Sequence, residues 1–290
     1  MEGQLVQLLS AAQSPQDGPR KAAEQQLLTS FGHPDLPPSL IRLASNDAAP
    51  LNIRQAALYY LKNLVLAGWS EDVAGFNGTV FVTNANKELL RPQLLELATS
   101  DQLDGKLRAA AGLVVSKIAA ADYPEQWPGL LESLLEKIPS ATDGQLHGGL
   151  KVLSELVEES FSEDTFFGVA KQLVSVLYNV AINDQRKPVL RALACSVFRQ
   201  SLDTLEMILE QHRDDVTAFA SDIIKDWMPF FISNLKMKLP EPPSMQEEEA
   251  ETPPPNAEMF KGVVAFKLQT VKVGHSGWLP NITLTSMCRP

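Results

Sequence analysis

Residues 50–69 read PLNIRQAALYYLKNLVLAGW, and this stretch decides the fold. It is long enough for about five helical turns. Its apolar residues fall on two neighbouring stripes of a helix: Ile53, Ala57, Tyr60 and Leu64 on one, and Leu58, Leu61 and Val65 on the other. An apolar face this wide predicts a helix that packs against neighbours on two sides, as in the middle of a stacked helical array.

One narrow polar stripe remains on this helix. Its members recur at spacings of three and four: Asn52, Gln55, Tyr59, Lys62 and Asn63. Because the rest of the helix is apolar, the stripe is the face left for a partner. For Lys62 two roles stay open, a docking contact or a solvated lysine with an apolar stem.

A short motif recurs where helices begin. An arginine precedes small residues at Arg20-Lys-Ala-Ala, Arg54-Gln-Ala-Ala, Arg108-Ala-Ala-Ala and Arg191-Ala-Leu-Ala. The spacings of 34, 54 and 83 residues correspond to one repeat, one repeat with an insertion at 68–84, and two repeats of about 40 residues. We expect these arginines to pair with neighbouring acidic residues. The period predicts an all-α fold, a right-handed α-solenoid of HEAT-type helical repeats.

The helical pattern also gives a domain division. Residues 1–240 are expected to form the repeats, with helices that include Arg20–Phe31 and Ser39–Ser45. The acidic, proline-rich segment 241–257 is expected to be a linker, and helix Met259–Val271 to start a further repeat within 258–272. Residues 273–290 lose the helical period and are expected to form an irregular tail.

Composition narrows the class of function. The chain has 290 residues and a net charge of −10, which disfavours nucleic acid as the direct ligand and favours basic partners. Two distant cysteines form neither a disulfide framework nor a zinc motif. No apolar run is long enough to span a membrane, and the N-terminal residues do not resemble a signal peptide.

Catalytic and cofactor patterns are missing from the sequence. The four histidines stand apart from cysteine or carboxylate at ligand spacing, and there is no glycine-rich phosphate loop. The paired carboxylates Glu158-Glu159 and Asp214-Asp215 fit helix ends better than acid–base chemistry. We therefore expect no enzyme activity, no cofactor and no metal.

Three segments in order resemble importin-beta-type nuclear transport receptors. They are AEQQLL at 23–28, RQAALYYLKNLVLAGW at 54–69 and AADYPEQWPGLL at 120–131. The last segment and the insertion after Trp69 look most like the importin-nine branch, which carries core histones. The resemblance covers roughly residues 1–240, whereas full receptors have about twenty repeats and this chain has about six. Proline and Trp127 at the last junction are expected to pack the corner between repeats.

The resemblance implies a partner and a site. Receptors of this family bind the GTP-bound form of the small GTPase Ran through the second helix of each early pair, on the inner surface. Carried over, Lys62 and Asn63 match the family's Leu-Lys-Asn positions and also lie on the polar stripe. The further candidates are Lys21, Gln55, Tyr59, Lys106 and Lys117.

The resemblance also implies protein import between cytoplasm and nucleus. The expected partners are Ran-GTP, basic cargo such as histones, and nucleoporins. The alternative is a generic HEAT-repeat scaffold subunit without affinity for Ran. Binding that depends on the nucleotide of Ran would distinguish the two.

Overall fold

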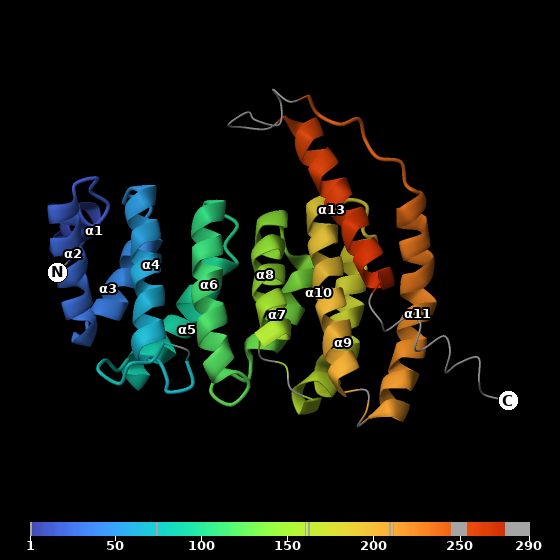
Figure 1. The fold of residues 1–290 in the computed structure, drawn as a ribbon, viewed down its shortest axis with the longest axis horizontal. Helices are drawn as coiled ribbons and strands as arrows, with labels where there is room; N and C mark the ends of the chain where they lie inside the picture. Colours follow the sequence, from blue (N-terminus) through green and yellow to red (C-terminus); the bar gives the residue numbers. More distant parts are fainter. Residues whose placement is uncertain are drawn as a thin grey trace. The chain divides into compact units, whose positions relative to one another are not determined.

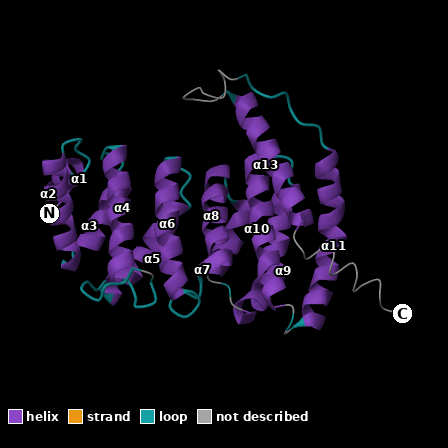
Figure 2. Ribbon diagram, viewed as in Figure 1, coloured by secondary structure: helices purple, strands orange, loops and turns teal. Residues whose placement is uncertain are grey.

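The protein is described by a computed structural model. The structure describes residues 2–73, 75–159, 161, 163–208, 210, 212–244 and 254–275. All regular elements in these ranges are helices (Figure 2), which confirms the all-α fold class. Contacts divide the chain into two compact units, residues 1–130 and 131–290, and each is taken by itself below.

The first unit consists of helical pairs in two layers. Helices α3 and α5 lie side by side in one layer and α4 and α6 in the other, with α3 packed on α4 and α5 on α6 (Figure 1). Helix α1 packs on both α2 and α4. The bounds are α1 Glu2–Ala11, α2 Asp17–Thr29, the 3-10 turn η1 Ser30–Gly32, α3 Leu36–Ser45, α4 Leu51–Gly68, α5 Asn84–Ala98 and α6 Gly105–Asp122.

The second unit is arranged around helix α10. Helices α8, α9, α11 and α13 all pack on it, and α11 also packs on α9 and α13. The bounds are α7 Leu130–Lys137, the 3-10 turn η2 Ile138–Ser140, α8 Asp143–Glu159, α9 Glu163–Ile182, α10 Pro188–Ile208, α11 Arg213–Lys236 and α13 Pro255–His275.

Helix α4 is buried on two sides, as its sequence predicts. Its neighbours are α3 and α6, with α1 at one end. The side chains predicted to face inward are all buried, namely Ile53, Ala57, Leu58, Tyr60, Leu61, Leu64 and Val65. This burial is the main apolar contribution that places α4 in the middle of the first unit.

Several helices begin earlier than expected because prolines lie in their first turns. Helix α3 starts at Leu36 and includes Pro37 and Pro38, and α2 starts at Asp17 and includes Pro19. The first-turn N–H groups have no intrahelical acceptor, so a proline there costs no hydrogen bond. Side chains cap the starts of α5 and α6: Thr83 accepts from the Asn86 N–H, and Asp104 from the Lys106 N–H.

The expected linker and tail are each shorter by three residues. Helix α13 spans Pro255–His275, so residues 255–257 and 273–275 are helical. Residues 245–253 of the linker and 276–290 of the tail lie outside the described residues. The division into domains expected from the sequence stays a prediction.

The repeated arginines are located at helix starts, but most of their partners are not the expected acids. Arg54 donates from Nε to the Ala44 carbonyl at 2.8 Å, and Arg191 donates from Nε to the Ala181 carbonyl at 2.7 Å. Arg108 donates to the carbonyls of Ser100 and Leu103. Each guanidinium thus binds carbonyls at or just after the end of the preceding helix, where backbone acceptors are unpaired and the helix dipole is negative. Within this set, Arg20 and Arg54 also form ion pairs with Asp17 and Asp47, and Asp184 acts on Arg191 through its charge.

The insertion after α4 folds back on that helix. The N–H groups of Asn77 and Val82 donate to the carbonyls of Ala67 and Gly68. A Cβ on Gly68 would lie 2.7 Å from the Val80 carbonyl oxygen, so only glycine admits this approach.

Candidate functional site

The polar stripe of α4 lies at the surface of the first unit. Asn52 and Tyr59 are exposed, Gln55, Lys62 and Asn63 are partly exposed, and none of the five is buried. Tyr59 has 55% of its area exposed, although the two residues before it and the two after it are buried. The stripe is therefore a real surface, formed because α4 buries its other sides against α3 and α6.

Lys62 and Tyr59 lie against each other on this stripe. The Lys62 ammonium lies 4.8 Å from the centroid of the Tyr59 ring, and the Tyr59 ring packs edge-on against Tyr60 at 5.5 Å between centroids. A cation over an aromatic face is held without losing its charge to a carboxylate. The pair thus presents a positive charge next to an exposed ring.

Helix α6 continues most of this surface in the same register, although Ser116, the counterpart of Lys62, is buried. Arg54 and Arg108 open α4 and α6 at equivalent places, so each position of α4 corresponds to the position 54 residues later in α6. Tyr59 corresponds to Leu113, which is 44% exposed, and Asn63 corresponds to the partly exposed Lys117. Asn52 corresponds to the exposed Lys106.

We call the shared surface the α4–α6 face. It consists of Asn52, Gln55, Tyr59, Lys62, Asn63, Lys106, Ala109, Leu113 and Lys117. The sequence candidates Gln55, Tyr59, Lys62, Asn63, Lys106 and Lys117 all belong to it. Leu113 was missed, although its place five residues after the motif arginine, the same as that of Tyr59, could have identified it.

The α4–α6 face is positively charged in a chain of net charge −10. Its basic residues are Lys62, Lys106 and Lys117, whereas Arg54 and Arg108 of the same helices bind carbonyls of preceding segments. Asp122 is their one acidic residue, and it is buried in an ion pair with Arg91. With no exposed carboxylate on either helix, this face attracts an acidic surface and repels a basic one.

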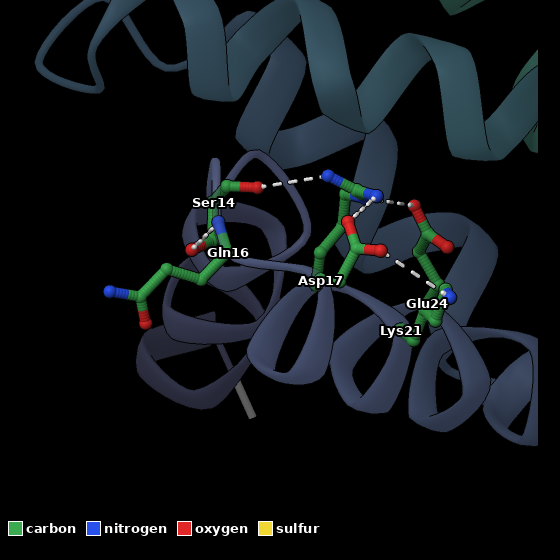
Figure 3. Close-up of polar contacts among 6 residues, drawn as sticks. Ser14, Gln16, Asp17, Lys21 and Glu24 are labelled. Carbon is green, nitrogen blue, oxygen red and sulfur yellow. Dashed lines mark hydrogen bonds and ion pairs between the residues drawn. The ribbon is translucent and has the colours of Figure 1, made fainter.

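Lys21, the remaining candidate, lies on α2 and is paired. Its ammonium lies 3.5 Å from Asp17, which also pairs with Arg20 (Figure 3). Glu24 lies 4.0 Å from Arg20 on the same helix. All these groups are exposed or nearly so, so the pairs contribute little to stability. The charge of Lys21 is offset locally, and Lys21 is a weaker candidate than Lys62.

Helix α2 nevertheless lies beside α4. Burial, followed by the charge of Glu24 and then Tyr59, raises the pKa of the Tyr60 phenol. At the start of α4, the Asn52 amide donates to the Gln13 side chain at 3.0 Å. These contacts tie the start of the chain to the edge of the α4–α6 face.

A buried polar cluster holds the other end of α4 and α6 in place. The Trp69 indole N–H donates to Asp122 Oδ2 at 2.9 Å, and Arg91 Nε donates to the same oxygen at 2.8 Å. Trp69 and Asp122 are buried. Trp127, which was expected to pack the corner after α6, is partly exposed, and its packing role stays a prediction. No local pattern links Trp69 to a residue 53 positions away.

The described residues also show whether a metal site or a membrane-spanning helix is present. Within the described residues, no group of three or more His, Cys, Asp or Glu side chains is placed to hold a metal ion. In the same part of the chain, every helix is too short or too polar to cross a lipid bilayer.

Comparison with known proteins adds a family. The importin-beta N-terminal domain matches residues 23–100, which include α3, α4 and α5. Importin subunit beta-5 of Schizosaccharomyces pombe is 31% identical over 244 residues, covering 82% of this chain and 24% of the relative. The chain spans about a quarter of the length of such curated relatives.

Solved structures of importins share the fold. Kap95p in a structure with RanGDP superposes with a TM-score of 0.66 at 15% identity, covering 99% of this chain and 30% of that one. Kap95 in a complex with Nup1 gives 0.65 at 15% identity, covering 98% and 31%. These structures confirm the HEAT-type solenoid fold class, whereas the narrower resemblance to the importin-nine branch stays a prediction.

The matched domain includes α4, the helix whose polar stripe, buried flanks and closing Trp69 carry the resemblance in sequence. The relatives and the fold agree with that match over most of the chain. The chain therefore belongs to the importin-beta family of nuclear transport receptors.

Proposed function

We propose that this chain binds Ran in its GTP form through the α4–α6 face, and that it takes part in protein import into the nucleus as part of an importin-beta-type receptor. The observation that carries the proposal is the charge of that face. Three lysines, Lys62, Lys106 and Lys117, belong to the face and no carboxylate does, although the whole chain is acidic.

The side chains of the face suit a protein partner. Tyr59 and Leu113 supply exposed apolar area at equivalent positions of neighbouring helices, and Lys62 places a charge directly over the Tyr59 ring. An aromatic anchor flanked by cations is typical of the residues that dominate protein interfaces. The solved structure of Kap95p with RanGDP supports Ran as the partner, since that protein has the same fold.

Lys62→Glu tests the proposal. The substitution reverses the charge at the centre of the face and removes the contact with the Tyr59 ring. We expect Ran-GTP binding to weaken by about 1–3 kcal/mol, with unchanged helicity because Lys62 is not in the core. The measurement is the affinity for Ran loaded with a non-hydrolysable GTP analogue or with GDP, at low and high salt. Association should slow more at low salt.

The matched control is Lys225→Glu. Lys225 is exposed on α11 in the other unit and carries the same charge change. Equal losses for both variants would attribute the effect to bulk charge and reject the α4–α6 face. Binding to neither nucleotide form would favour the alternative, a scaffold without affinity for Ran.

Further partners follow from the same assignment. The acidic remainder of the chain suits a basic cargo such as histones, and the solved Kap95:Nup1 complex supports nucleoporins as partners. Both fit a protein that moves between cytoplasm and nucleus. Pull-down of core histones that weakens as salt rises is the expected result for the cargo.

A further inference from the structure

A groove lies in the second unit, between α10 and α13. The groove has a volume of about 660 Å³. It is lined by Lys187, Pro188, Val189, Pro255, Glu258, Met259, Lys261, Gly262 and Ala265. We call it the α10–α13 groove. All of its residues lie within the described part of the second unit.

Gly262 sets the base of the groove. A Cβ at this position would lie 3.1 Å from the Pro188 Cβ and from the Val189 nitrogen, so glycine lets α13 rest directly on the first turn of α10. Figure 1 shows α13 crossing α10 obliquely.

The walls of the groove are apolar and open to solvent. Val189 is 46% exposed and Met259 is 48% exposed. Met259 is unbranched and flexible, which lets it adapt to the shape of an incoming side chain. Burying a medium-sized apolar side chain between these residues would remove apolar surface from water on both partners.

The charges around the groove are mainly positive. Lys187 and Lys261 line it and are exposed, against one carboxylate, Glu258. The described residues of α13 carry three lysines and one glutamate in a chain of net charge −10. Both helices begin at this groove, with Pro188 and Pro255 as their first residues. Helix N-termini add further attraction for carboxylates.

We propose that the α10–α13 groove binds a short acidic, amphipathic peptide segment of another protein. One apolar side chain of the segment inserts between Val189 and Met259, and flanking carboxylates contact Lys187 and Lys261. Two lysines beside a glutamate are too few for a nucleic acid ligand, which needs several phosphate contacts. The acidic net charge of the whole chain opposes an acidic partner at long range. The apolar contact therefore supplies most of the affinity, and the lysines supply orientation and selectivity.

A set of synthetic peptides tests the chemistry of the ligand. The probe is a fluorescein-labelled 14-residue peptide with a Leu-Leu-Phe centre flanked by glutamates. One matched peptide replaces the glutamates by lysines, and another replaces the apolar centre by serines. Fluorescence anisotropy should show binding of the probe and at least roughly tenfold weaker binding of both matched peptides. Equal or tighter binding of the lysine peptide would overturn the proposal.

Variants of the full chain test the location. The double variant Lys187→Glu, Lys261→Glu should weaken probe binding by roughly tenfold, because both orienting charges are reversed. The matched double variant Lys225→Glu, Lys272→Glu changes the total charge equally, at exposed positions outside the groove lining, and should stay within about twofold. Equal losses in both doubles would show a bulk charge effect and reject the groove.

Met259→Ser provides an independent measure of the apolar contact. Because Met259 is half exposed, the substitution removes groove surface and leaves the core intact. We expect at least a fivefold loss of probe affinity, about 1 kcal/mol, with an unchanged circular dichroism spectrum. Unchanged affinity would place the apolar side chain elsewhere and reject the proposed contact.

Discussion

The helices of the first unit are linked by a buried carboxylate, whereas those of the second unit are linked by packed aromatic rings. In the first, Asp122 accepts hydrogen bonds from Trp69 and Arg91 and so links α4, α5 and α6 through one buried carboxylate. In the second, Phe198 of α10 stacks on Trp227 of α11 at 3.7 Å between ring centroids, and Phe266 of α13 packs against Phe230 at 5.8 Å.

We call these two sets of contacts the first joint and the aromatic joint. Their difference determines how the stability of each responds to a single substitution. A buried charge is stable only while its partners remain, so the loss of one partner leaves the other unpaired in a low-dielectric site. An aromatic cluster sums many weak contacts, so the loss of one ring costs a share of the total. The first joint is therefore expected to be the more sensitive to a single substitution.

The largest effect is expected for Asp122→Ala. The change leaves the Arg91 guanidinium and the Trp69 N–H without their shared acceptor. Leaving a buried charge unpaired costs about 3–5 kcal/mol. Urea unfolding, with amide hydrogen exchange to localise the effect, should show faster exchange in α4, α5 and α6 and little change in the second unit, since repeats contact only their neighbours.

A double variant separates charge from packing. Arg91→Met combined with Asp122→Leu removes both charges and keeps apolar volume. Most of the lost stability should return, as replacement of whole buried ion pairs by apolar residues is often neutral. A double variant as unstable as Asp122→Ala would mean that the cluster acts mainly by shape.

The arginine at the start of α4 gives the next effect. Arg54 is buried and donates to the Ala44 carbonyl, so Arg54→Met should cost about 1.5–3 kcal/mol by unfolding in urea. Asp47, the other partner of Arg54, has a side chain that is 90% exposed. Asp47→Asn should therefore cost less than about 0.5 kcal/mol. Equal costs for the two variants would show that the ion pair with Asp47, the kind of partner expected from the sequence, is the main contact of Arg54.

A smaller loss is expected in the aromatic joint. Phe198→Leu keeps an apolar side chain but removes the stack on Trp227 and the contact with Phe231. We expect a loss of about 1–2 kcal/mol, read from urea unfolding and from the near-ultraviolet circular dichroism of tryptophan. A cost as large as that of Asp122→Ala would contradict the contrast between the two joints.

Sequence reasoning succeeded where the signal is periodic. The spacing of apolar residues in 50–69 predicted a helix buried on two sides, and the remaining spacing predicted the exposed stripe with Tyr59 and Lys62. The repeated arginines were found by their motif, and the expected acidic partners are present at Arg20 and Arg54. The carbonyl acceptors of Arg54, Arg108 and Arg191 were not expected, because a backbone carbonyl has no residue type to recognise. The Trp69–Asp122 bond was not predictable, since it joins residues 53 positions apart that become neighbours only after the helices stack.

Prolines misled the sequence analysis in a consistent way. The two helices were expected to start at Ser39 and Met259, after these prolines, whereas Pro37, Pro38 and Pro255 lie in the first turns of α3 and α13. Proline ends a helix on its C-terminal side and is accepted at its start. The charge of the α4–α6 face was readable in principle, but it needed the pairing of α4 with α6, which the sequence alone did not give.

The smallest effect concerns a buried ionisable group without a strong partner. Cys195 lies in α10 near the aromatic joint and is fully buried. Burial raises the pKa of its thiol to about 12, with a smaller opposing effect of Arg191. Asp122 keeps its charge because two donors bind it. The Cys195 thiol, in contrast, stays neutral because its charged form would be desolvated.

The sign of the pH dependence follows from that shift. The folded chain keeps a thiol proton that the unfolded chain releases above its ordinary pKa of 9.0, so this contribution to stability is present below pH 9 and lost between pH 9 and 12. At pH 10 the loss is about 1 kcal/mol, and at pH 7 it is absent.

Urea unfolding of the wild type and of Cys195→Ala at pH 7.5 and 10, both in a Cys288→Ser background, isolates the thiol because all other groups titrate in both chains. The wild type should lose more stability than the variant over this interval. Equal losses, together with rapid alkylation of the native thiol at pH 8, would show that Cys195 is accessible and that the aromatic joint is looser than its packed rings imply.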